Sequence, residues 1–161
     1  AHSPTIYAQS VTSMEQLLNY PETWRKTLTS RRVRADAALA PLLKCKPGEQ
    51  WFLLSTLRHP KGSTTPMCWI DIYLEPRYAG VTRHKNQDHM LICDQIVDMY
   101  GETLDRVHME LSAGEVPSRM ARRLKVTPGS PALFVLRRYL DITPFFDVVS
   151  DREVLVKRVS H

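Results

Sequence analysis

The sequence predicts an α+β domain in which an antiparallel sheet is flanked by helices. Segments that alternate apolar and polar residues are interleaved with segments of helical apolar spacing. The pattern A-x-x-L-K-x-x-P-G occurs twice, as APLLKCKPG at 40–48 and as ARRLKVTPG at 121–129. In each copy a strand and a helix precede the pattern and a hairpin follows it. We therefore predict an internal duplication, in which two similar halves share one sheet.

Caps and breakers delimit the elements of the first half. Ser13 with Gln16 three residues later is a capping box, and Asp36 is expected to cap an Ala/Leu-rich helix. The linker or tail covers residues 1–12, and 13–161 form one domain. The predicted elements of the first half are a helix at 13–18, a strand at 23–34, a helix at 36–44 and a hairpin within 51–76.

The second half repeats this order after one additional helix. Apolar residues from Leu91 to Tyr100 recur at helical spacing, and Gly101 is expected to end that helix. Pro117 is tolerated because it falls in the first turn of a helix. The predicted elements are a helix at 88–100, a strand at 103–113, a helix at 115–125 and strands at 131–141 and 145–157 around a turn at 142–144.

Composition limits the function classes. The 161 residues carry a formal net charge of +5, but no block of five or six like charges that would indicate a nucleic-acid surface. The densest basic run, residues 30–34, is interpreted as the solvent face of a strand. Three widely spaced cysteines argue for a reducing compartment, which we expect to be the cytoplasm. No apolar run approaches the ~18 residues of a membrane-spanning helix.

The hairpin WFLLSTLRHPKGSTTPMCWIDIYLEP, residues 51–76, carries charges that a sheet tolerates only with a partner, a ligand or water. Strand periodicity places Thr56 and Arg58 on one face of the first strand. On the returning strand Asp71 and Tyr73 share a face. If the turn has the register we expect, Arg58 and Asp71 point to the same side.

The offset between the two patterns extends this site to the second half. Arg137 falls at the place of Thr56, Tyr139 at the place of Arg58, and Asp147 near the place of Asp71. A cleft with arginines, carboxylates and aromatic walls suits a small polar metabolite. The candidate ligand-binding residues are Thr56, Arg58, Asp71, Tyr73, Arg137, Tyr139 and Asp147. The alternative is a pair of ion pairs at the sheet rim, Arg58–Asp71 and Arg137 or Arg138 with Asp147.

Almost the whole chain, from about residue 7 to 157, resembles the UTRA effector-binding domain of HutC-type GntR-family transcription regulators. The stretches that carry the resemblance are LLKCKPGEQWFLLSTLRHPKGSTTPMCWIDIYLEP, ICDQIVDMYG and ELSAGEVPSRMARRLKVTPGSPALFVLRRYLD. The order of these motifs, with two PG turns that each lead into a strand with arginine, is specific to the family.

The resemblance implies a chorismate-lyase-like fold and a sensing function. A small effector would bind here and change the DNA affinity of an N-terminal winged helix-turn-helix, which this chain lacks. The family's R-x-R matches Thr56-Leu57-Arg58, so only the second arginine is present, and its two acidic positions match Asp71 and Asp147. The missing arginine favours a carboxylate or a less charged effector over a sugar phosphate. The turn ITPFFDVV departs from the usual glycine-containing one.

The resemblance also implies a cytoplasmic homodimer, most simply a repressor, with no cofactor and no membrane partner. We expect the effector to order a loop around residues 78–90. Two other functions stay open: a dimerisation module with a vestigial pocket, and a chorismate-lyase-like enzyme. The sequence contains no nucleophile and base in register, and His89 with Cys93 supplies only two metal ligands, so we predict no catalytic or metal site.

Overall fold

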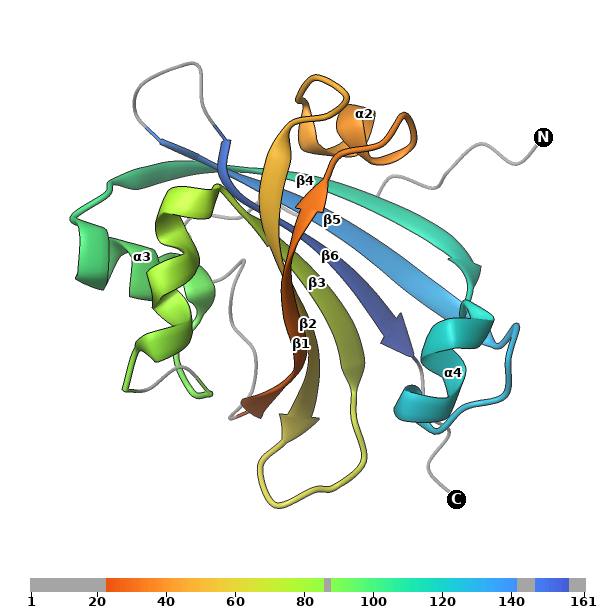
Figure 1. Ribbon diagram of the computed structural model, residues 1–161. Helices are drawn as coiled ribbons and strands as arrows, with labels where there is room; N and C mark the ends of the chain where they lie inside the picture. Colours follow the sequence, from red (N-terminus) through yellow and green to blue (C-terminus); the bar gives the residue numbers. More distant parts are fainter. Residues whose placement is uncertain (1–22, 86–87, 142–146, 157–161) are drawn as a thin grey trace.

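A computed structural model describes residues 23–85, 88–141 and 147–156 (Figure 1). It contains one six-stranded antiparallel sheet in the order β1-β2-β3-β6-β5-β4. The strands are β1 (Thr23–Arg34), β2 (Gln50–Pro60), β3 (Cys68–Leu74), β4 (Leu104–Glu115), β5 (Pro131–Asp141) and β6 (Asp147–Val156). The helices are α2 (Leu39–Leu43), the 3-10 helix η1 (Pro76–Arg83), α3 (Ile92–Tyr100) and α4 (Ser118–Leu124). The predicted α+β class with an antiparallel sheet is confirmed.

The backbone hydrogen bonds of the two halves repeat at an offset of 81 residues. Gly48 donates its N–H to Ala35 at 2.7 Å, and Gly129 donates its N–H to Val116 at 3.1 Å. Lys44 and Lys125 both end their helices in the left-handed conformation, with φ of 53° and 57°. The sheet order places the two three-stranded halves side by side, joined by β3 and β6. This repetition supports the predicted duplication.

Most predicted elements form with small changes of boundary. Asp36 caps α2, because its Oδ1 accepts the N–H groups of Ala38 at 3.0 Å and Leu39 at 2.7 Å. The helix predicted at 88–100 begins only at Ile92. The cause is Arg25 of β1, whose N–H binds the carbonyl of Asp88 at 2.7 Å and so holds the preceding segment outside the helix. The predicted helix at 13–18 and the turn at 142–144 lie outside the described residues.

The segment expected as a loop at 78–90 contains a 3-10 helix instead. Tyr78 and Val81 of η1 are fully buried against the sheet. The Tyr78 hydroxyl donates to Glu102 at 2.7 Å, and the Tyr78 ring meets Tyr100 edge-on with centroids 5.1 Å apart. This packing makes residues 76–83 part of the core, and leaves only 84–91 as the connection to α3.

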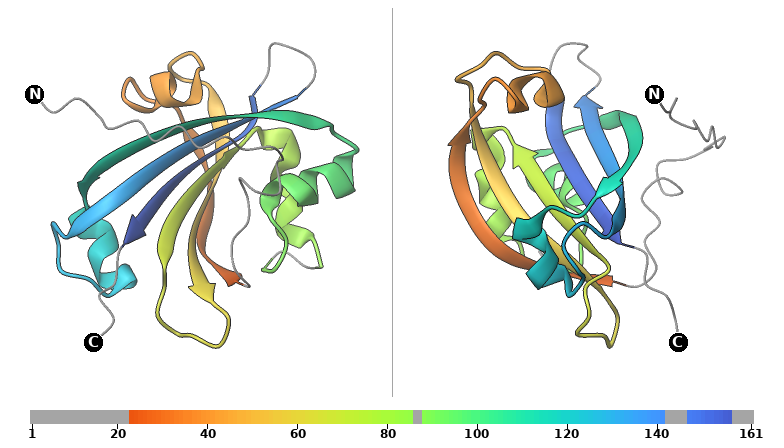
Figure 2. Two further views of the ribbon diagram at one scale, coloured as in Figure 1. Left: turned by 180° about the vertical axis from the view of Figure 1, so that it is seen from behind. Right: turned by 90° about the vertical axis from the view of Figure 1, so that its right-hand side faces the viewer.

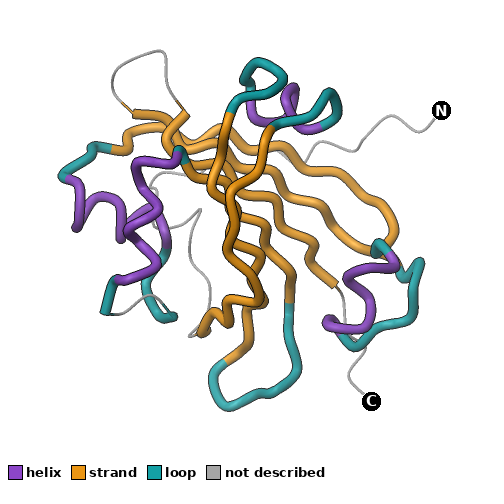
Figure 3. The backbone as a smooth tube through the Cα atoms, in the orientation of Figure 1, coloured by secondary structure: helices purple, strands orange, loops and turns teal. Residues whose placement is uncertain are grey.

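The two faces of the sheet carry different helices. The α3 face is covered by η1 and α3, which pack on Leu54, Ile70 and Ile72. The α4 face is covered by α4, which packs on Leu57 and Trp69, and by α2. Figures 1 and 3 show α3 and α4 at opposite sides of the sheet, and Figure 2 shows the curl of the strands between them. No helix in the described ranges is long and apolar enough to cross a membrane.

Candidate functional site

The register of β2 and β3 places Arg58 and Asp71 on opposite faces of the sheet. Arg58 lies opposite Cys68, and Asp71 lies opposite Ser55. Arg58 therefore belongs to the α3 face and Asp71 to the α4 face. The prediction that both side chains point to the same side is wrong, because it assumed a register shifted by one residue. Such a shift moves every side chain of a strand to the other face.

Asp71 and Tyr73 contact the helices of the α4 face. The Asp71 Oδ1 accepts the Ser55 hydroxyl and the Trp69 indole N–H, each at 2.8 Å. Its Oδ2 lies 3.7 Å from Arg119 of α4, whose guanidinium also lies over the Trp69 ring. Tyr73 packs against the apolar cluster under α2. Neither residue meets Arg58, so we assign both to the scaffold.

We expect Asp71→Ala to lower the free energy of unfolding by about 1–3 kcal/mol, because Ser55 and Trp69 would lose a buried acceptor. Urea denaturation with an unchanged m-value measures this loss. Glu49→Ala, which removes an exposed carboxylate, serves as the control. A change in Asp71→Ala no larger than in the control would contradict the scaffold role.

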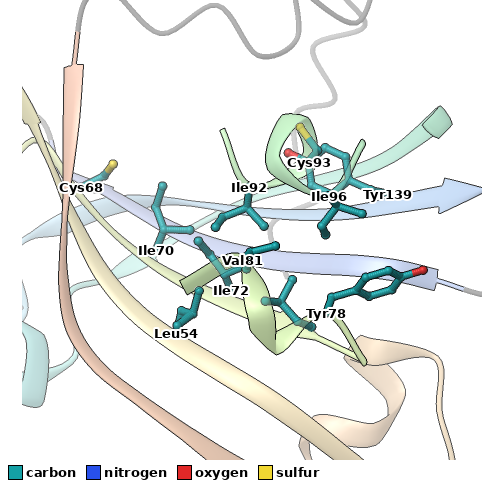
Figure 4. Close-up of a cluster of buried hydrophobic side chains, with 11 residues drawn as sticks. Leu54, Cys68, Ile70, Ile72, Tyr78, Val81, Ile92, Cys93, Ile96 and Tyr139 are labelled. Carbon is teal, nitrogen blue, oxygen red and sulfur yellow. The ribbon is translucent and has the colours of Figure 1, made fainter. Parts of the chain in front are cut away.

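The α3 face holds Thr56 and Arg58 of the first hairpin and Tyr139 of the second. Thr56 is fully buried, and its hydroxyl donates to the Ile70 carbonyl at 3.0 Å. Arg58 is 4% exposed and donates through Nη1 to the Thr23 hydroxyl at 2.7 Å. Tyr139 is buried in the apolar cluster of this face, toward the end opposite Cys68 (Figure 4). Arg58 is thus the hairpin residue that brings charge to this face.

The second half contributes Arg137 to the same face. Arg137 lies opposite Asp151, as Thr56 lies opposite Ile70. Arg137 follows Thr56 by 81 positions, and Asp151 follows Ile70 by the same 81 positions. The predicted equivalence of Arg137 and Thr56 is therefore confirmed. Arg137 donates through Nη2 to the Glu153 carboxylate at 2.7 Å, with side chains 8% and 2% exposed.

Asp147 does not occupy the place of Asp71. It is the first residue of β6 and lies opposite Leu140, at the position equivalent to Pro66. The residue 81 positions after Asp71 is Arg152, which pairs with Asp71 itself where the two halves meet. The prediction failed because it allowed for a shorter turn in the second hairpin, whereas both strands of the two hairpins keep the same offset of 81 residues, with Arg137 opposite Asp151 as Thr56 is opposite Ile70. The side chain of Asp147 lies outside the described residues.

Cys68 connects the charges of the two halves. Burial raises the pKa of its thiol, the Glu153 carboxylate raises it further, and the guanidinium groups of Arg58 and Arg137 act in the opposite direction. The geometry agrees with these effects, because Arg58 lies opposite Cys68, Glu153 lies opposite Ile70 on the same face, and Arg137 contacts Glu153 at 2.7 Å. Arg58, Cys68, Glu153 and Arg137 therefore form one buried cluster on the α3 face.

Arg25 adds a third guanidinium that the sequence did not reveal. It lies opposite Arg58 in the sheet and is 2% exposed. Burial, and then the charge of Arg58, lower the pKa of Arg25 to about 10. Its Nη1 donates to the Met90 carbonyl at 3.1 Å, and the Gln95 amide of α3 donates to the same carbonyl at 3.1 Å. Arg25 thus joins the cluster to the segment that precedes α3.

We call this group the arginine cluster; its members are Arg25, Arg58, Cys68, Arg137 and Glu153. Among the described residues the cluster brings together three buried guanidinium groups and one buried carboxylate. Buried charge is costly unless it is balanced, so such an excess favours the binding of an anion. The arrangement is chemically suited to hold a carboxylate or phosphate group.

The rim ion pairs considered as an alternative take other forms. Arg58 and Asp71 cannot pair, because they lie on opposite faces. Arg137 pairs with Glu153 at 2.7 Å, and Arg138 reaches Glu110 at 3.3 Å. Glu153 was missed because its partner depends on the pairing of β5 with β6. Its only signal in the sequence was a carboxylate inside an apolar strand, as for Asp71.

Comparisons with known proteins agree with this architecture. A family model described as the UTRA domain matches residues 22–145. No curated protein matches the chain. The effector domain of PhnF from Mycobacterium smegmatis shares the fold with a TM-score of 0.68 at 17% identity, over 83% of this chain and 80% of that one. A ligand-binding domain from Bordetella bronchiseptica, described as that of a GntR-family transcriptional regulator, gives 0.70 at 21% identity, over 89% and 92%. In another structure of the M. smegmatis PhnF the match covers 57% of the PhnF chain, with a TM-score of 0.68 at 16% identity.

Proposed function

This chain belongs to the UTRA domain family, and we propose that it is the effector-binding domain of a bacterial DNA-binding transcription regulator. The family consists of binding domains rather than enzymes, which agrees with the prediction that the chain has no catalytic site. The DNA contacts would be made by a separate N-terminal domain. A cytoplasmic homodimer of the HutC type that acts as a repressor completes the proposal.

The proposed effector is a small polar anion that binds at the arginine cluster. The supporting observation is the burial of three guanidinium groups with one carboxylate on a single face. Arg25 and Arg58 lie side by side on neighbouring strands, and like charges at this separation repel. An anion between them would offset this repulsion. A carboxylate or a phosphate group has the charge and the acceptor geometry for this position.

The path from effector to regulation would pass through Arg25. This residue holds both the Asp88 and Met90 carbonyls, and Met90 also binds Gln95 of α3. If an anion draws Arg25 toward Arg58, the segment 88–91 and the start of α3 change position. An effector switches such an equilibrium only if it binds one arrangement more tightly than the other.

A thermal-shift panel tests the proposal, with small carboxylates, imidazole acids, sugar phosphates, phosphonates and amino acids. We expect one class to stabilise the chain by about 2.7 kcal/mol at a hundredfold excess over its Kd. Arg58→Ala should abolish that shift. Arg32→Ala removes the same charge from an exposed position of β1 and should leave the shift intact.

Three outcomes would overturn parts of the proposal. A shift retained in Arg58→Ala would move the effector site away from the arginine cluster. The absence of any shift, together with a stable dimer in sedimentation analysis, would favour the dimerisation module with a vestigial pocket. Turnover of chorismate in an absorbance assay would restore the enzyme as the leading function.

A further inference from the structure

The α4 face contains a second buried guanidinium, that of Arg138, which the proposed function does not use. Arg138 is the neighbour of Arg137 on β5 and so points to the opposite face. It is 4% exposed. Its Nη2 lies 3.3 Å from the Glu110 carboxylate, a long contact for an ion pair. Its Nε and Nη1 are buried and meet no hydrogen-bond acceptor in the described part of the chain.

Buried donors without acceptors are costly, and more so on a charged group. Glu110 cannot satisfy them, because it reaches only Nη2 and its side chain is 54% exposed. Glu110 also contacts His108 of the same strand, at 3.1 Å. The buried Nε and Nη1 of the Arg138 guanidinium therefore need acceptor atoms that Glu110 does not supply.

Two further basic side chains belong to the same region of the α4 face. His108 lies directly opposite Arg138 in the sheet, and its side chain is 54% exposed. Lys44 ends α2, and α2 packs on Tyr73. Tyr73 pairs with Ser150 of β6, which pairs with Arg138, so Tyr73 and Arg138 lie in the same row of the sheet. The His108 hydrogen bond, the charges of Arg138 and His108, and finally the charge of Lys44 lower the pKa of the Glu110 carboxyl. The exposed His108 and Glu110 side chains form the side of the site that is open to solvent.

We propose that Arg138, Lys44 and His108 form a second anion-binding site, for an oxyanion such as phosphate or a carboxylate, on the face opposite the arginine cluster. The Glu110 carboxylate occupies part of this site and competes with the ligand. The oxyanion displaces Glu110 toward solvent, accepts hydrogen bonds from Nε or Nη1 of Arg138, and is held by the Lys44 ammonium at the rim. The site does not depend on the function proposed for the other face.

The competing role of Glu110 predicts opposite effects for two exposed substitutions. Removing the Lys44 charge weakens the attraction for the anion, whereas Glu110→Gln removes a like charge that repels it. Each exposed charge changes the affinity for an oxyanion by about fivefold. We therefore expect a Kd for phosphate that is about fivefold higher in Lys44→Gln and about fivefold lower in Glu110→Gln. Lys46→Gln, two residues from Lys44 and also exposed, is the matched control and should leave the Kd unchanged.

The measurement is a titration of the 161-residue chain with inorganic phosphate, followed by the arginine Nε–H signals in ¹⁵N NMR spectra. Arg138→Lys assigns the signal of Arg138. Sodium chloride at equal ionic strength controls for screening. A saturable shift of the Arg138 signal, retained in Arg58→Ala, supports the site. A parallel titration with acetate shows whether phosphate or carboxylate binds more tightly.

Three results would overturn the inference. The Arg138 signal could show no saturable shift with phosphate or acetate, which would mean that ordered water satisfies the buried donors. Chloride could produce the same shift. Lys44→Gln and Glu110→Gln could both leave the Kd unchanged. The titrations themselves use the native chain and two surface substitutions, and Arg138→Lys serves only to assign the signal.

Discussion

Replacing Glu153 by glutamine is expected to lower the free energy of unfolding by about 3–5 kcal/mol. The substitution leaves the buried Arg137 guanidinium without its carboxylate partner at 2.7 Å. Arg58 acts on the same cluster, so the charges that remain in the arginine cluster itself are all positive. The cost of an uncompensated buried charge exceeds that of a lost hydrogen bond. Urea denaturation followed by circular dichroism measures it.

Two further variants separate charge imbalance from loss of packing. Arg137→Met with Glu153→Leu removes both charges, and such apolar replacements of buried ion pairs are neutral or stabilising in other proteins. We expect this double variant to recover most of the loss. Glu115→Gln, at an exposed carboxylate of β4, should change the stability by no more than about 0.5 kcal/mol. If Glu153→Gln also changes the free energy of unfolding by no more than about 0.5 kcal/mol, the Arg137–Glu153 pair is not electrostatically important.

Glu153→Gln also bears on the effector site. Since the substitution removes the buried carboxylate of the arginine cluster, an anion would meet three guanidinium groups without a described buried competitor. Any anion that stabilises the native chain through Arg58 should therefore stabilise Glu153→Gln by a larger amount.

Truncating the equivalent core leucines of the two halves should destabilise the domain by similar amounts. Leu43 of α2 and Leu124 of α4 are 81 positions apart, and they are 1% and 0% exposed. Each helix is short and is held to the sheet by its apolar cluster. Leu→Ala at a buried position costs about 2–5 kcal/mol, so we expect each variant to lose an amount in that range.

Urea denaturation with a constant m-value tests this pair of variants. Leu111→Ala is the matched surface control, because that side chain is 45% exposed on β4. Its effect should stay near 0.5 kcal/mol or below. A loss below about 1 kcal/mol at either Leu43 or Leu124 would contradict the structural equivalence of the two helices.

The repeated pattern A-x-x-L-K-x-x-P-G was the most informative feature of the sequence. It predicted the second half from the first, including the equivalence of Arg137 with Thr56, because identical local hydrogen bonds surround both copies. The boundary at Ile92 could not be predicted in the same way. It depends on Arg25, a residue more than sixty positions away that binds the carbonyls of the preceding segment.

The candidate site was predicted only in part, for reasons that lie in strand pairing. Arg58 and Arg137 meet on one face, but Asp71 and Tyr73 lie on the other. A shift of one residue in the pairing of β2 with β3 would exchange the two faces of a strand. The sequence of the turn does not determine this pairing. Arg25 and Glu153 enter the site because β1 pairs with β2 and β6 pairs with β5.

The sequence by itself determined the fold class, the two halves and the family, since these depend on local periodicity, on turn chemistry and on the order of motifs. Only the tertiary structure decided which charges share a face. Each strand offers its side chains alternately to two faces, and the choice between them is made by hydrogen bonds to a neighbouring strand. The same physics placed Arg137 in the arginine cluster and its neighbour Arg138 in the second proposed site on the opposite face.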